Sequence, residues 1–208
     1  MPDMHSFVLF LAAGLALNFT PGPDMLYVAA RGASEGRAAG IVSALGIGAG
    51  TLVHITLVAL GLAALLAAVP VAYLVVRISG AAYLIYLGVR ALRAKDSSEK
   101  ITIKPARLSV VFRQGVVTNV LNPKVALFFL AFLPQFVDPS RGNPAVQVAA
   151  LGLVFDTTGT LVNLAVGIGS SRAGASLRQM RRPSAVLKKI TGALFIGMGI
   201  RLAACSHR

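Results

Sequence analysis

The chain has 208 residues, of which 56% are hydrophobic and only 13% are charged. Soluble domains carry about 25% charged residues, so this composition excludes an ordinary soluble protein and indicates a membrane protein. The net charge of +13 comes from Lys and Arg residues that cluster between apolar runs, which fits loops beside anionic lipid and argues against a nucleic-acid partner.

Six apolar segments follow one another along the chain, and each is long enough for a transmembrane helix of roughly 20 residues. The first is interrupted by Asn18-Phe19-Thr20-Pro21-Gly22-Pro23-Asp24 and the fourth by Asn122-Pro123-Lys124. Because proline lacks an N–H and clashes with the preceding turn, we expect both helices to break there. The six segments cover residues 6–30, 39–68, 71–92, 115–137, 145–168 and 185–204.

A broken helix at membrane depth is tolerated only where it is buried in protein or lines a cavity. The two breaks are therefore predicted to form the wall of an intramembrane site. The alternative for the first break is a plain loop between two short hydrophobic segments.

Basic residues concentrate in the first, third and fifth connections, beginning with Arg31 and Arg37 in the first. The second connection has no basic residue, and the fourth has only Arg141. Cytoplasmic loops carry an excess of Lys and Arg, so the odd-numbered connections are predicted to be cytoplasmic and both termini periplasmic.

The two halves of the chain repeat a short pattern. Gly14-x-x-x-Asn18 precedes the first break and Gly115-x-x-x-Asn119 precedes the second. Each break then places an ionisable residue, Asp24 or Lys124, after a proline. Three spans per half is an odd number, so the second half must be inverted relative to the first. Interrupted helices at matching positions of inverted repeats are typical of a secondary transporter's binding site.

The predicted fold is an all-α membrane protein with six transmembrane helices, of which the first and fourth are broken. The helices form two inverted three-helix repeats, residues 1–92 and 114–208, joined by a cytoplasmic linker at residues 93–113.

Thr20 and Asn122 suit the N-cap position, and the prolines after them suit the first position of a restarted helix. Free N–H groups at such a helix start favour anions. Lys124 adds a positive charge and Asp24 a negative one, which together would suit a zwitterion such as an α-amino acid. The alternative is an Asp24–Lys124 ion pair that only locks the two halves together. The predicted substrate-binding residues are Asn18, Thr20, Pro21, Gly22, Pro23, Asp24, Asn119, Asn122, Pro123 and Lys124.

Asp156 lies well inside the fifth segment, where a low dielectric favours the neutral form of a carboxyl group. It is the first candidate for a proton-coupling residue, and a carboxyl hydrogen-bonded to a neighbouring helix is the alternative. Asp24 and His54 are further candidates, although a lone histidine is more often a packing and hydrogen-bonding residue. The glycines at 36, 40, 46 and 50 are expected to allow close helix packing.

The first break resembles the N-terminal signature of the LysE/RhtB amino-acid exporter superfamily, and Asn122-Pro123-Lys124 resembles its second signature. The resemblance implies export of amino acids from the bacterial cytoplasm across the inner membrane by proton antiport, and it is closer to the homoserine/threonine branch than to the lysine/arginine branch. Further motifs that agree are Gly36-x-x-x-Gly40, Gly46-x-x-x-Gly50-x-x-x-His54, Ser79-Gly80-x-x-Tyr83-Leu84-x-Tyr86-Leu87-Gly88, Phe128-Phe129 and Leu133-Pro134-Gln135-Phe136.

Two other classes compete with an exporter of neutral amino acids. A membrane enzyme is disfavoured because neither HExxH nor GxSxG occurs and no metal-ligand cluster is present. A structural membrane protein would not need Asp24, Lys124 and Asp156 at depth. The predicted partners are a small amino acid, protons and membrane lipid, with a homodimer left open and no cofactor or metal expected.

Overall fold

The computed structural model describes residues 3–68 and 105–177, together with residues 78, 81, 82, 85, 86, 89, 92, 93, 193, 196, 197, 200 and 203. Every regular element within these residues is helical. The predicted third and sixth spans, at 71–92 and 185–204, fall largely outside the described residues. The arrangement of six spans in two inverted repeats therefore stays a prediction.

The described helices alternate between bent pairs and long single helices. Helices α3 and α7 each contain a stretch long and apolar enough to cross a membrane, Arg37–Gly61 with 25 residues and Pro144–Arg172 with 29. The full set is α1 (Met4–Phe19), α2 (Pro23–Glu35), α3 (Arg37–Ala68), α5 (Leu108–Val120), α6 (Pro123–Leu127), a π-helical turn η1 (Phe128–Phe132), two 3₁₀ turns η2 (Leu133–Phe136) and η3 (Pro139–Arg141), and α7 (Pro144–Leu177).

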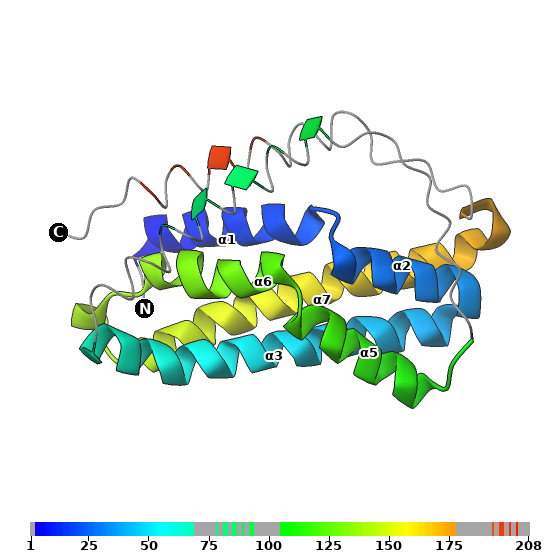
Figure 1. Cartoon of the computed structure of the whole chain (residues 1–208), viewed down its shortest axis with the longest axis horizontal. Coiled ribbons are helices and arrows are strands. Elements are labelled where there is room, and N and C mark those ends of the chain that lie inside the picture. The colour runs from blue at the N-terminus through cyan, green and yellow to red at the C-terminus, as the bar shows by residue number, and fades with distance from the viewer. Residues whose placement is uncertain are drawn as a thin grey trace.

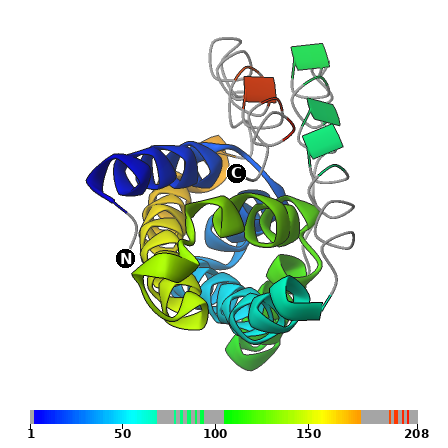
Figure 2. The same cartoon turned by 90° about the vertical axis from the view of Figure 1, so that its left-hand side faces the viewer.

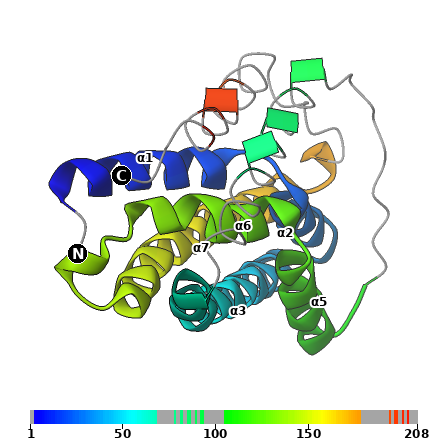
Figure 3. The ribbon, with the colours of Figure 1, turned by 60° about the vertical axis from the view of Figure 1, so that its left-hand side comes forward.

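The two predicted helix breaks are confirmed. Helices α1 and α2 meet at an angle of 48°, and the α5 helix meets the segment Pro123–Phe136 at 46°. Figure 1 shows that the α1–α2 pair and the α5–α6 pair run in opposite directions along the bundle. Helix α6 lies between α1 and α3 in the views of Figures 2 and 3. Each break thus falls near the middle of a bent apolar helix.

Glycines set the close approach of the long helices. A Cβ atom on Gly40 would lie 2.6 Å from the carbonyl oxygen of Gly167, and one on Gly46 would lie 2.4 Å from that of Phe112. A Cβ atom on Gly50 would lie 2.7 Å from the Cβ of Asn119. These contacts confirm close packing of α3 against α7 and α5 at the predicted glycines.

Gly36 differs from that prediction. It has a φ of +90°, no atom of the described residues lies within 4 Å of its Cβ position, and it is the C-cap of α2 just before α3 begins. Because L residues rarely adopt this backbone conformation, Gly36 is needed for the reversal of the chain and not for packing.

Arg31 does not lie in a connecting loop as the apolar pattern predicted, because α2 continues to Glu35. Arg31 is only 4% exposed, its side chain pairs with Glu35, and its Nη2 donates to Gln114 Oε1 on α5 at 2.5 Å. Glu35 also accepts the backbone N–H of Ala106 at 2.7 Å. This buried guanidinium joins α2 to α5 through its partners. The place of Arg31 in the chain therefore reflects this pairing as well as the preference of basic residues for the cytoplasmic side.

Phenylalanine side chains fill the opposite end of the bundle. Phe128 stacks on Phe155 with ring centroids 4.5 Å apart, and it lies 5.8 Å from Phe10. Phe10 in turn meets Phe136 edge-to-face at 5.4 Å. Edge and offset contacts of this kind stabilise an apolar core. This aromatic cluster packs α1, the π-helical turn and α7 together.

Candidate functional site

The first break is an extended segment between α1 and α2. Thr20 is the C-cap of α1, with its backbone N–H bonded to Leu17 O, and its hydroxyl donates to Ala16 O at 2.7 Å. The N-cap of α2 is Gly22, which makes no side-chain capping bond. The prediction that Thr20 is an N-cap is therefore wrong. Pro21 disfavours helical backbone at the residue before it, and Pro23 takes the first helical position instead.

The second break follows the predicted pattern. Asn122 is the N-cap of α6, its Oδ1 accepts the backbone N–H of Lys124 at 3.0 Å, and Pro123 holds the first helical position. Helix α6 extends for only five residues before the π-helical turn begins at Phe128. One of the few free N–H groups at this helix start, that of Lys124, is already capped. The anion site expected there stays a prediction.

Asp24 and Lys124 meet across the two breaks. The Lys124 Nζ lies 3.3 Å from Asp24 Oδ1, and it also donates to Thr20 O at 3.1 Å and to Leu17 O at 3.4 Å. The two residues are 7% and 6% exposed. A Cβ atom on Gly22 would lie 2.7 Å from Asp24 Oδ1 and 2.9 Å from Lys124 Nζ, so this glycine makes room for the pair. The sequence left open whether the two charges pair, and in this structure they do.

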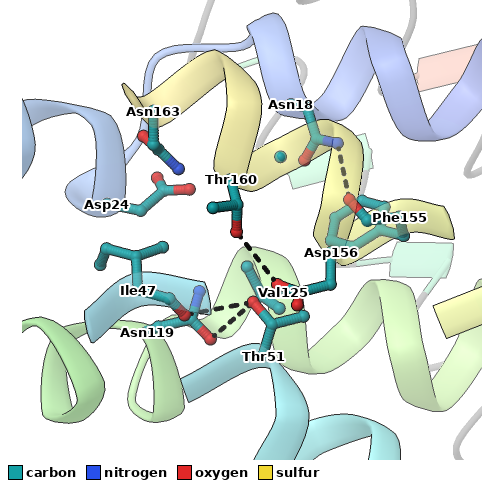
Figure 4. Close-up of a pocket in the computed structure, with 11 residues that line it drawn as sticks. Asn18, Asp24, Ile47, Thr51, Asn119, Val125, Phe155, Asp156, Thr160 and Asn163 are labelled. Carbon is teal, nitrogen blue, oxygen red and sulfur yellow. Dashed lines mark hydrogen bonds between the residues drawn. The ribbon is translucent and has the colours of Figure 1, made fainter. Parts of the chain in front are cut away.

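A small polar cavity lies beside Asp24, between the first break, α3, α5 and α7 (Figure 4). It holds about 10 Å³ of space for the centre of a water-sized sphere, which is roughly room for one water molecule. An amino acid fits only after the surrounding helices separate. The residues that line it are Asn18, Asp24, Ile47, Thr51, Asn119, Val125, Phe155, Asp156, Gly159, Thr160 and Asn163.

The two asparagines of the repeated pattern have matching roles. Asn18, in the last turns of α1, donates to Phe155 O at 3.2 Å and to Thr158 Oγ1 at 3.0 Å on α7. Asn119, in the last turn of α5, accepts from Thr51 Oγ1 on α3 at 3.4 Å. Each asparagine thus ties the half-helix before a break to one long helix, and both line the cavity.

Asp156 faces the cavity from α7, where Thr160 Oγ1 donates to its Oδ1 at 3.4 Å (Figure 4). His54 is buried outside the cavity lining, with Nε2 3.2 Å from Asn119 O and its ring stacked on Phe129. The structure therefore places Asp156 with Asp24 at one site, and it gives His54 the packing and hydrogen-bonding contacts that a lone histidine usually has.

Most of the cavity-lining residues on α3 and α7 were not predicted from the sequence, although the spacing of some of them carried a signal. Thr160 and Asn163 follow Asp156 by four and seven residues, which places all three on one helix face. Ile47 and Thr51 share a face of α3 for the same reason. A search for polar residues at helical spacing from Asp156 would have found Thr160 and Asn163, but not the two residues on α3. The residues missed are Ile47, Thr51, Val125, Phe155, Gly159, Thr160 and Asn163.

Three known proteins are similar to this chain along nearly its whole length. An uncharacterized membrane protein of Pseudomonas aeruginosa is 35% identical over 210 residues, covering 98% of this chain and 96% of that protein. An uncharacterized membrane protein of Vibrio cholerae is 29% identical over 205 residues, covering 97% and 98%. A leucine efflux protein of Klebsiella pneumoniae is 26% identical over 202 residues, covering 95% and 94%. No solved structure matches the chain.

The sequence also matches the family model of the LysE type translocators over residues 15–206. This match includes both helix breaks, the Asp24–Lys124 pair and the whole cavity lining. The chain therefore belongs to the LysE type translocator family and is a membrane transport protein, not an enzyme.

Proposed function

We propose that this protein exports a neutral α-amino acid from the bacterial cytoplasm across the inner membrane, in exchange for protons. The observation that carries the proposal is the buried Asp24–Lys124 pair, which joins two helix breaks beside a polar cavity. Intramembrane charges of this kind usually mark a substrate or ion pathway.

A zwitterion can separate such a pair without leaving a buried charge uncompensated. Its ammonium group would bind Asp24 and its carboxylate would bind Lys124, so each charge would exchange one partner for another. An unpaired charge at this depth costs several kcal/mol. A ligand with only one charge would leave one side chain unpaired, which favours an α-amino acid over a simple anion or cation.

The cavity supports a neutral substrate side chain. Ile47 and Val125 offer apolar contacts, and Thr51 and Thr160 offer hydroxyl groups. The leucine efflux relative favours an aliphatic amino acid, while the resemblance to the homoserine/threonine branch favours a hydroxylated one. We therefore propose the class of neutral amino acids and include both kinds in the test.

Within the described part of the chain, side-chain contacts lie on both sides of the cavity, and transport would require each side to open in turn. On the side that we place at the cytoplasm, Arg31 donates to Gln114 on α5 and Glu35 accepts from Ala106 just before α5. The aromatic cluster lies on the side that we place at the periplasm. Six spans in inverted repeats, with both termini periplasmic, would allow this by rocking one half against the other. A reporter fused after Arg208 should then be active only if it needs the periplasm.

The proposal is tested by counterflow of radiolabelled amino acids in proteoliposomes. The panel contains leucine, threonine, homoserine, lysine and glutamate, each with and without an imposed pH gradient. We expect uptake of at least one neutral amino acid, faster with the gradient, and no uptake of lysine or glutamate. Absence of flux for every amino acid would support a structural role of the ion pair, and flux of lysine alone would contradict the neutral class.

A further inference from the structure

The end of α1 is arranged to receive a cation. The last carbonyl groups of a helix lack intrahelical partners and carry the negative end of its dipole. Here Leu17 O accepts the Thr20 N–H, but its fourth neighbour Pro21 has no N–H to donate, and the chain leaves α1 in an extended conformation at Thr20. Leu17 O and Thr20 O both accept from Lys124 Nζ. Asp24 adds a carboxylate oxygen from the start of α2. Three oxygens from both sides of the break therefore surround one point.

The Lys124 ammonium occupies that point. An ammonium group carries three N–H donors and no acceptor. Its three acceptors here lie at 3.1 Å (Thr20 O), 3.3 Å (Asp24 Oδ1) and 3.4 Å (Leu17 O) from Nζ. The number of acceptors equals the number of donors, and the group is buried.

We propose that Leu17 O, Thr20 O and Asp24 Oδ1 form the amino-group subsite for the substrate, which Lys124 occupies as a tethered cation between transport cycles. The inference rests on the proposed export of amino acids and names the atoms that hold the ammonium. A substrate ammonium has the same charge and the same three donors as the lysine ammonium. Asp24 belongs both to these three oxygens and to the cavity lining, so the two places are continuous.

The exchange explains how the protein can change conformation while empty. With substrate bound, the substrate ammonium neutralises Asp24 and Lys124 turns to the substrate carboxylate. Without substrate, Lys124 itself neutralises Asp24. Asp24 is then never left unpaired at membrane depth, where an isolated charge is costly.

Removal of the tether tests the subsite directly. In Lys124→Ala the three oxygens remain, so a small primary ammonium ion should bind there and stabilise the purified protein in detergent. We expect ethylammonium at tens of millimolar to raise the melting temperature of Lys124→Ala by roughly 2–4 °C, by mass action on the folded state. Tetramethylammonium has no N–H donors and should give no shift.

Two control variants locate the effect. The double variant Asp24→Asn with Lys124→Ala lacks the carboxylate and should not respond to ethylammonium. Arg107→Ala removes an exposed cation at the start of α5 and should not respond either. Equal shifts in all three variants, or no shift in a folded Lys124→Ala, would overturn the proposal.

If Lys124→Ala does not fold, recognition of the substrate's amino group is tested on the unmodified protein. The amino acid that the counterflow panel selects should raise the melting temperature, whereas its 2-hydroxy acid analogue, which lacks the ammonium, should not. An equal shift from both compounds would show that the amino group is not recognised. Failure of all transport with a positive ethylammonium response would contradict the export function and leave the cation subsite intact.

Discussion

The two helix breaks share a plan and differ in one respect. Both bend the helix by a similar angle, 48° and 46°, and both restart it with proline at the first position and a charged residue at the second. The second break is completed by its own side chain, because Asn122 caps Lys124 N. The first break has only Gly22 as N-cap, and its carbonyl oxygens bind the side chain of Lys124.

This difference makes the two sides of the site chemically unlike. The capped break is a firm base from which Lys124 extends, and the uncapped break is the receptor for its ammonium. Two breaks with identical capping would present similar groups to the substrate. An α-amino acid has two different ends, so the asymmetry between the breaks suits it.

The largest effect is expected from separating the charges. Asp24→Asn and Lys124→Met should each reduce export by at least 100-fold, because each removes one of the two groups that hold the zwitterion. Breaking a buried pair also costs about 3–5 kcal/mol of stability, whereas neutralising both members costs much less. The double variant Asp24→Asn with Lys124→Met should therefore fold well and still not transport, as measured by melting temperature and counterflow.

The charge-swapped protein sharpens this result. In Asp24→Lys with Lys124→Asp the pair can form again, but the carbonyl oxygens at the end of α1 would then lie beside the carboxylate of residue 124. We expect only partly restored stability, because those carbonyl oxygens lose their donor, and no restored export. Near-normal export by the swapped protein would mean that the two charges act only as a structural pair.

The fold was predictable from the sequence where backbone chemistry dominates. Prolines inside apolar runs predicted both breaks, because no other residue removes an N–H and blocks the preceding turn. The asymmetry between the breaks was not predictable from the same pattern. Two prolines follow Thr20 and either could start a helix, so the pattern did not decide that α2 begins at Pro23.

The site was only partly predictable, for a similar reason. Asp24, Lys124 and Asp156 stand out because charges are rare in membrane helices. Thr51 and Thr160 do not, since single hydroxyl residues in such helices commonly bond to their own backbone. The closure of the cavity to about the volume of one water molecule depends on side-chain packing, which spacing does not encode.

The second prediction concerns which carboxyl group couples proton movement to transport, Asp24 at the first break or Asp156 on α7. Asp156 faces the cavity and accepts from Thr160, and within the described part of the chain no cationic side chain pairs with it. Asp24, by contrast, is held by Lys124. Asp156 is therefore the better candidate for taking up and releasing a proton.

Asp156→Asn keeps the shape of the side chain and removes its titratable group. Efflux driven by a pH gradient should therefore fall at least tenfold, while exchange at equal pH should continue. Both are measured in proteoliposomes. If efflux by the variant responds to the gradient as that of the unmodified protein does, Asp156 is not the proton-coupling residue, and Asp24 and then His54 become the candidates.

The third prediction concerns the space at the uncapped break. Gly22→Ala would place a Cβ atom within 3 Å of both Asp24 Oδ1 and Lys124 Nζ, and these groups would have to move apart. We expect about a tenfold loss of export, on the order of 1.4 kcal/mol, with the protein still folded. Gly61→Ala is the matched control, since no atom of the described residues lies within 4 Å of its Cβ position, and it should transport normally. Equal activity of the two variants would mean that the ion pair need not keep this geometry.

The smallest effect tests the capping difference itself. Asn122→Ala removes the side chain that caps Lys124 N, at a cost of about 1 kcal/mol, and it should lower export a fewfold by loosening the base of Lys124. Asn122→Ser keeps a capping oxygen and should restore most of the stability. Thr20→Ala should cost less, because the Thr20 hydroxyl bonds back to Ala16 O within α1 and caps nothing in α2. Thermal unfolding of the three variants measures the order. If Thr20→Ala were as destabilising as Asn122→Ala, both breaks would be capped alike, and the difference between receptor and base would disappear.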